Sequence, residues 1–317
     1  MTNTYWPMDS TNHPRFAGPV SFFRLPMLDD PAAVDIALVG LPWDGGTTNR
    51  AGTRHGPREM RAASTLIRPF HHVTRKSPYS HARVADLGDA PVNPIDIQDS
   101  LAKVAAFYTG VHQAGAMPVT TGGDHLITLP ILRAIAKDGP VGLIQFDAHA
   151  DVNDSYFGGH KFTHGTWVRR AIEEGLVDPH RTVQIGIRGA RYSAEGGDYS
   201  DQMGIRTIYI EEVFEKGLKT TVTEIRRVVG PLPAYLTFDV DGIDPAYAPG
   251  TGTPEVGGYT THDAQVMLRG LDGLNLIGAD VVEVSPPFDP SGNTALVGAT
   301  MLFEILCLVA EARRLHR

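Results

Sequence analysis

The chain contains one cysteine, Cys307, among its 317 residues. A single thiol cannot form an intramolecular disulfide, and the sequence holds neither a CxxC redox motif nor a zinc site built from cysteines. A protein without disulfides suits a reducing compartment, so we expect it in the cytoplasm.

The sequence also lacks the features that carry a chain into or across a membrane. Residues 1–7 show neither the basic nor the apolar segment of a secretory signal. The most apolar stretch, residues 294–310, is short and carries Glu304 near its middle. We therefore expect a buried core helix there rather than a membrane span.

Positive charge is in deficit. Lysine and arginine number 28 against 36 aspartates and glutamates, which gives a net charge of −8. Binding to nucleic-acid phosphates needs a basic surface, so no nucleic-acid partner is expected. The excess acid can reflect ordinary solubility, or it can be neutralised in part by bound divalent cations.

What the chain does have is a regular alternation of short apolar runs and amphipathic segments. Strands are expected at residues 35–40, 118–121, 141–146, 183–187, 206–210, 235–238 and 277–284, and helices at 97–115, 129–136, 166–174, 221–229, 262–270 and 294–313. Seven or eight such alternations predict one α/β domain with a parallel sheet between two helical layers. No linker or repeat interrupts residues 1–317, and we expect residues 1–34 to be an extension packed on the domain or on a neighbouring subunit.

Acidic and histidine residues cluster directly after several expected strands. The clusters are residues 122–125 (Gly-Gly-Asp-His), 147–151 (Asp-Ala-His-Ala-Asp) and 239–244 (Asp-Val-Asp-Gly-Ile-Asp), with Glu283 at the end of another strand. In open parallel sheets, ligands bind at the carboxyl ends of the strands. We therefore expect all four pieces to meet in one crevice.

These residue types predict a pair of metal ions. Alternate residues of an extended Asp-x-His-x-Asp segment point to the same side, and so many carboxylates in one pocket need a counter-charge. Asp and His ligands without thiolate suit Mn²⁺, Co²⁺, Ni²⁺ or Zn²⁺. Each cluster alone could be a capped turn, an Asx turn or a solvated loop, but their joint occurrence favours a two-metal centre.

At these residues the sequence resembles the ureohydrolase family, which includes arginase, agmatinase and related amidinohydrolases. Residues 248–258 and 280–287 resemble its agmatinase-like branch, and the likeness spans roughly residues 35–315. The resemblance implies a single α/β domain with an eight-stranded parallel sheet, two manganese ions and a homotrimer or homohexamer. Nickel is an alternative metal.

The resemblance also implies a role for each site residue. One metal would be held by His125, Asp147, Asp151 and Asp239, and the other by His149, Asp147, Asp239 and Asp241. Asp151 would pass a proton from the attacking water to the leaving amine, and Glu283 would bind the guanidinium. His164 would shuttle protons to solvent, although it could instead be a partly exposed loop histidine. Asp124 and Asp244 could orient ligands, whereas His71, His72, His81 and His180 are expected at the surface.

The loop at residues 153–162 bears on the substrate. His160 and Lys161 make it basic, Arg50 is another possible partner for a carboxylate, and the bulky Tyr156 would shorten the pocket. This set favours a carboxylate tail, although Lys161 could simply point to solvent. We predict hydrolysis of 3-guanidinopropionate to β-alanine and urea, with 4-guanidinobutanoate or agmatine as the alternatives.

Two other classes of protein compete with this interpretation. A metal-binding homologue without activity would be expected to lose Asp151 or Glu283, and both are present. An amide deacetylase on a related scaffold would use one metal and fewer carboxylates. Metal stoichiometry separates that class from a ureohydrolase.

Overall fold

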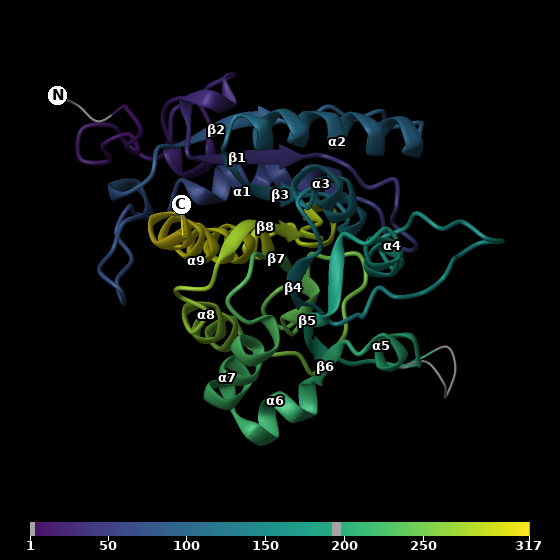
Figure 1. Cartoon of the computed structure of the whole chain (residues 1–317). Coiled ribbons are helices and arrows are strands. Elements are labelled where there is room, and N and C mark those ends of the chain that lie inside the picture. Colours follow the sequence, from purple (N-terminus) through teal and green to yellow (C-terminus); the bar gives the residue numbers. More distant parts are fainter. Residues whose placement is uncertain (1–3, 192–197, 317) are drawn as a thin grey trace.

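The computed structural model describes residues 4–191 and 198–316 and contains one sheet of eight parallel strands. The strands are β1 (Ile36–Leu41), β2 (Val84–Asp89), β3 (Met117–Gly122), β4 (Val141–Phe146), β5 (Val177–Ile187), β6 (Arg206–Tyr209), β7 (Ala234–Asp239) and β8 (Leu276–Val282). Their order is β2-β1-β3-β8-β7-β4-β5-β6, and in Figure 1 the sheet runs from β2 at the top to β6 at the bottom. The predicted parallel α/β sheet is confirmed.

Helices cover both faces of the sheet. They are α1 (Gly56–Ser64), α2 (Ile97–Gln113), α3 (Thr128–Ile135), α4 (Trp167–Glu173), α5 (Asp198–Met203), α6 (Ile210–Lys216), α7 (Leu218–Val229), α8 (Thr261–Arg269) and α9 (Asn293–His316). Short 3-10 helices are η1 (Phe22–Arg24), η2 (Pro31–Ala33), η3 (Thr53–His55), η4 (Pro78–Ser80), η5 (His125–Ile127), η6 (Val240–Gly242) and η7 (Pro286–Phe288). Side chains of α1, α7, α8 and α9 share one apolar core, and those of α2, α3 and α4 share the other.

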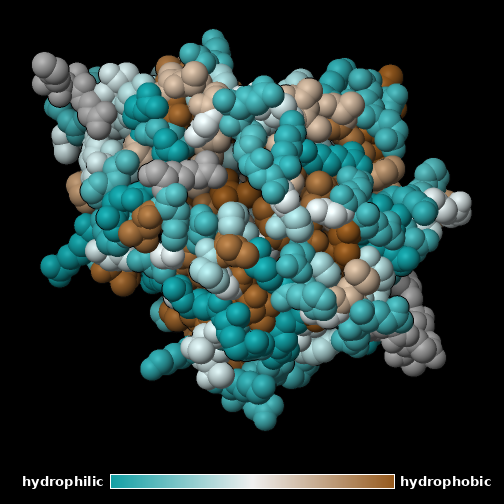
Figure 2. Space-filling view, in the orientation of Figure 1, coloured by the Kyte–Doolittle hydropathy of each residue, from teal (hydrophilic) through white to brown (hydrophobic). Residues whose placement is uncertain are grey.

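The central strands are buried along their whole length and are mainly apolar, because neither face of the sheet meets water there. Every residue of β4 and of β7 is buried, as expected for parallel strands with helices on both sides. Figure 2 shows that the outer surface in the same view is mainly hydrophilic, with hydrophobic residues scattered among polar ones. The apolar residues of the sequence therefore lie mostly inside.

Helix α9 is long and apolar enough to cross a membrane, but 83% of its most apolar window is buried inside the protein. Glu304 lies on this helix and is buried, where it accepts hydrogen bonds from Arg269 and pairs with Nε2 of His71 at 2.8 Å. The prediction that His71 lies at the surface is therefore wrong. Its position was missed because its partner is 233 residues away in the sequence.

The N-terminal extension packs against its own domain. Phe22, Phe23 and Leu25 are buried in the core shared with α9, and the backbone N–H of Phe22 donates to Asp86 of β2 at 2.9 Å. Strand β2 was not predicted, because Asp86 and Asp89 interrupt its apolar pattern. Both acids form ion pairs with Arg61 of α1, Asp86 at 2.9 Å and Asp89 at 2.6 Å.

Candidate active site

The sheet order brings the predicted site residues together. Strands β3, β8, β7 and β4 are consecutive neighbours, so the segments that follow them meet at one edge of the sheet. His125 begins η5 just after β3, Asp147 follows β4, Asp239 ends β7, and Glu283 follows β8. The segment after β3 also passes close to the segment after β1, and this approach requires glycine, because a Cβ on Gly123 would lie 1.6 Å from the carbonyl oxygen of Trp43.

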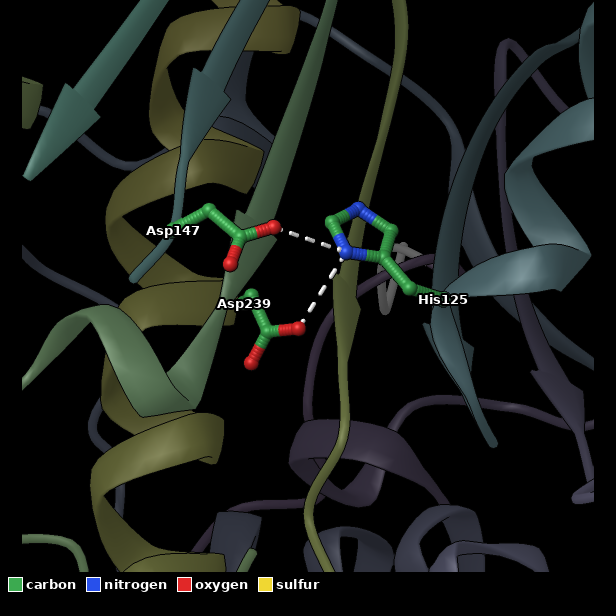
Figure 3. Close-up of side chains that lie close together, drawn as sticks. All are labelled: His125, Asp147 and Asp239. Carbon is green, nitrogen blue, oxygen red and sulfur yellow. Dashed lines mark ion pairs between the residues drawn. The ribbon is translucent and has the colours of Figure 1, made fainter. Parts of the chain in front are cut away.

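One group of possible metal ligands surrounds His125. Its Nδ1 lies 3.0 Å from Asp147 Oδ2, 3.2 Å from Asp151 Oδ2 and 3.2 Å from Asp239 Oδ2. Figure 3 shows Asp147 and Asp239 directing their carboxylates at the same ring nitrogen. All these side chains are buried. A single cation between them could contact one nitrogen and several oxygens.

A second group lies beside the first and shares Asp147. His149 Nδ1 is 3.0 Å from Asp241 Oδ2 and 3.6 Å from Asp147 Oδ1. The donor atoms of Asp147, His149 and Asp241 all lie within 4.8 Å of one another, as do those of His125, Asp147 and Asp239. The arrangement has room for two ions joined by at least one carboxylate.

The hydrogen bonds of His125 test whether a metal fits. Its Nε2 lies 2.7 Å from Thr237 Oγ1, and that hydroxyl donates to Asp280 Oδ1. Because the threonine proton is used by Asp280, the hydroxyl accepts from Nε2–H, and Nδ1 keeps a lone pair. Nδ1 is buried without a hydrogen-bond partner. A bare lone pair facing three carboxylates is repulsive unless a cation lies between them, so the donor set fits a metal ion.

The pKa values of the buried carboxylates also indicate that the site favours added positive charge. Burial, reinforced by the charges of Asp241 and Asp147, raises the pKa of Asp239 well above its ordinary value. Burial and the Asp147 charge also raise the pKa of Asp151. Burial therefore disfavours the ionised forms of these two carboxylates, and added positive charge would stabilise them.

Buried amides orient the shared Asp147. Gln145 Nε2 donates to Asp147 Oδ2 at 2.7 Å, and Gln184 Nε2 donates to Gln145 Oε1 at 2.8 Å. Gln184 also donates to the backbone oxygen of Ala150 at 2.6 Å. Neither glutamine was predicted from the sequence. The available signal was a single amide within each of two otherwise apolar runs, residues 141–146 of β4 and 183–187 of β5.

Glu283 is held with one oxygen fixed and the other without a partner. Oε1 accepts from the backbone N–H of His125 and lies 2.9 Å from Nδ1 of His164. Oε2 has no hydrogen-bond partner although Glu283 is 1% exposed. Both Glu283 and Asp151 have left-handed backbones, with φ of 63° and 54°. Such strain in non-glycine residues is concentrated at functional sites.

His164 is buried rather than a partly exposed loop residue. Its Nε2 accepts from the backbone N–H of Thr48 at 3.1 Å, which places the proton of the neutral ring on Nδ1, facing Glu283. Burial disfavours the charged ring, but the Glu283 carboxylate outweighs burial and raises the pKa of His164 to about 9. The ring therefore joins Glu283 to Thr48.

A cavity of about 410 Å³ opens over the metal-ligand cluster and His164, and Glu283 lies outside its lining. Its lining includes His125, His149, Asp151, Asp239, Asp241, His164, Tyr156, Glu255, Arg188, Arg191 and Tyr209. Tyr156 thus lies where the sequence analysis expected it, whereas His160 and Lys161 are exposed and do not line the cavity.

Arg50 is used for another purpose. Its guanidinium donates to the carbonyl oxygens of Thr251 and Gly252 and stacks over the Phe288 ring, 4.2 Å from the centroid. It is absent from the cavity lining. We correct the expectation that Arg50 contacts a carboxylate, because its N–H groups already donate to the loop at Thr251 and Gly252.

The two aspartates expected to orient ligands hold backbone segments. Asp244 accepts hydrogen bonds from the backbone N–H groups of Gly257 and Gly258, whereas Asp124 caps η5, which begins with His125.

Comparisons with known proteins agree with this geometry. Residues 34–308 match the arginase family. The chain is 61% identical to guanidinopropionase of Pseudomonas aeruginosa, with 96% of each chain covered, and 50% identical to guanidinobutyrase of the same organism, with 97% of each covered. Among solved structures, proclavaminate amidino hydrolase of Streptomyces clavuligerus superposes with a TM-score of 0.90 at 37% identity, covering 94% of this chain and 99% of that one.

Proposed function

This chain belongs to the arginase family and is a ureohydrolase, which cleaves a C–N bond of a small guanidino compound, and we propose that its substrate is 3-guanidinopropionate, hydrolysed to β-alanine and urea. The observation that carries the choice of substrate is the 61% identity with guanidinopropionase over nearly the whole chain. Tyr156 in the cavity lining supports a short tail. A pocket that differs by one methylene separates substrates by only about 1–3 kcal/mol, so 4-guanidinobutanoate is the nearest competitor.

We propose manganese as the metal, with nickel as the alternative. His125, Asp147, Asp151 and Asp239 would hold one ion, and His149, Asp147, Asp239 and Asp241 the other. When bound, paired divalent ions lower the pKa of water towards neutrality and so supply a nucleophile for the unreactive guanidinium.

The chain's own residues position the substrate and move protons. Glu283 Oε2, which is buried and unpaired, would accept an N–H of the guanidinium, while Oε1 stays fixed by its two partners. Asp151, fixed by the indole N–H of Trp167 at 2.8 Å, would carry the proton from the attacking water to the leaving amine. His164 would exchange protons with solvent beside Thr48, which also lines the cavity.

The test is urea release from protein loaded separately with Mn²⁺ or Ni²⁺, over a panel of 3-guanidinopropionate, 4-guanidinobutanoate, agmatine, arginine and guanidine. We expect 3-guanidinopropionate to give the highest kcat/KM and the loaded protein to contain about two metal ions per chain. Agmatine as the best substrate would refute the choice of a guanidino acid. One ion per chain would refute the two-metal centre, and the absence of urea with either metal would favour a non-catalytic protein.

We further propose that the protein is a cytoplasmic homotrimer or homohexamer that contacts neither membrane nor nucleic acid. The net charge of −8 supports the last point. Light scattering on the metal-loaded protein tests the assembly, since a monomeric mass would contradict it.

A further inference from the structure

The cavity needs a cation if the substrate has a carboxylate tail. Among the described residues that line it, the permanent cations are Arg188 and Arg191, both in the segment that follows β5. The basic residues Lys161 and Arg50 lie outside the lining. Arg188 and Arg191 are therefore the two candidate partners for the substrate carboxylate.

Arg188 is a structural residue. Its guanidinium donates to the backbone oxygens of Asp241 at 2.7 Å, Glu255 at 2.7 Å and Gly242 at 3.0 Å. It also donates to Gly186 at 3.1 Å. These hydrogen bonds join the segments after β5 and β7 and use most of the N–H donors of Arg188, so few donors remain for a ligand.

Arg191 is placed differently. It is exposed, and its hydrogen bond runs to a neutral group, the hydroxyl of Tyr209, at 2.5 Å. Its guanidinium also lies 5.3 Å from the centroid of the Tyr209 ring. The ion pairs found among the described residues do not include Arg191. Its charge therefore has no acidic partner among the described residues, and its contact to Tyr209 leaves other N–H groups of the guanidinium available.

The sheet places this arginine on the same side of the molecule as the metal ligands. Ile187 at the end of β5 pairs with Tyr209 at the end of β6, and β5 is the neighbour of β4. A substrate with its guanidinium at Glu283, which follows β8, would extend over the ends of β7 and β4 towards β5. Arg191 and Tyr209 therefore line the cavity at the sheet's β6 end, away from Glu283.

We propose that Arg191, supported by Tyr209, binds the carboxylate of the substrate and thereby selects guanidino acids over agmatine. The inference rests on the proposed function. A guanidinium carries five N–H groups in a planar fork that matches a carboxylate, and Tyr209 occupies one side of the fork. The tyrosine ring also favours the cation by its π-face. The ammonium of agmatine would be repelled at the same place.

The test compares Arg191→Met with the unsubstituted protein on 3-guanidinopropionate and on its neutral amide, 3-guanidinopropionamide. We expect kcat/KM for the acid to fall on the order of 10- to 100-fold, mainly through KM, since a charge-assisted contact is lost. The value for the amide should stay within about two- to threefold, because the amide makes no ionic contact. Arg191→Lys should recover part of the loss, because it restores charge but not the planar fork.

Arg68→Met is the matched control, because Arg68 is an exposed arginine outside the cavity lining. It removes the same charge and should keep the preference for the acid. Equal losses on acid and amide in Arg191→Met would show a structural role and overturn the inference. An unchanged preference would overturn it as well, as would a collapse in Lys161→Met but not in Arg191→Met. If the unsubstituted protein itself prefers agmatine, the proposed function fails instead, so the two failures are distinguishable.

Discussion

At the scale of single residues, Glu283 carries the sharpest prediction. Its free Oε2 is buried beside an oxygen that two donors hold in place. Glu283→Gln keeps the size and removes the charge, so the guanidinium loses an ionic partner inside the protein. We expect kcat/KM to fall by roughly 100-fold or more, since breaking a buried ion pair costs about 3–5 kcal/mol. Steady-state kinetics measures the fall. Metal content should stay at the unsubstituted value, and loss of metal would show that Glu283 acts on the fold instead.

The residue scale is also where the sequence was most informative. Asp147, His149 and Asp151 stand within five consecutive positions directly after a strand, so short spacing alone predicted that they share a site. The residues that were missed reach the site from far away. Asp280 acts on His125 through Thr237, and Gln184 acts on Asp147 through Gln145. Such two-step contacts depend on strand register, which no local pattern records.

At the scale of elements, the pairing of β4 with β5 aligns Gln145 with Gln184, and each amide donates towards Asp147. Gln145→Met keeps the approximate volume but removes the donor to the shared carboxylate. We expect metal affinity to fall about 10- to 100-fold, the usual effect of losing a group that orients a ligand. Metal content after dialysis against graded chelator measures it. Gln184→Met removes a donor one hydrogen bond further from Asp147, so metal affinity should also fall, but by less. A larger fall than in Gln145→Met would contradict a hydrogen-bond relay from Gln184 through Gln145 to Asp147.

The elements also show where pattern reading stops. Strands β4 and β7 were predicted because most of their residues are apolar, whereas β2 carries buried Asp86 and was missed. Helix α1 was not predicted either, and it begins at Gly56 and Pro57, at the end of a stretch rich in glycine. Its glycine is required by packing, since a Cβ at Gly56 would lie 2.5 Å from the carbonyl oxygen of Val284. A tertiary contact of this kind leaves no pattern in the local sequence.

At the scale of the whole molecule, Asp35 joins three distant parts of the chain. It precedes β1, and its carboxylate accepts from Arg83 before β2 at 3.0 Å and from Arg313 near the end of α9 at 2.8 Å. Burial by itself would raise the pKa of Asp35, but the hydrogen bonds and charges of these arginines outweigh it and lower the pKa to about 2. Because the folded pKa lies below the ordinary 3.8, the ionised carboxylate stabilises the fold above about pH 4. That contribution is lost as the pH falls towards 2.

The prediction concerns Asp35→Asn. Lowering the pKa from 3.8 to about 2 corresponds to about 2.4 kcal/mol, which solvent screening at this partly exposed site reduces to about 1 kcal/mol at pH 7. Denaturant unfolding of both proteins at each pH from 7 down to 3 gives the difference, and effects common to both cancel. The difference should be constant from pH 7 to about 5 and shrink below pH 4. A difference that stays constant down to pH 3 would show that Asp35 acts by packing. The N-terminal strand and the C-terminal helix would then be held together by their apolar contacts, with no electrostatic contribution from this carboxylate.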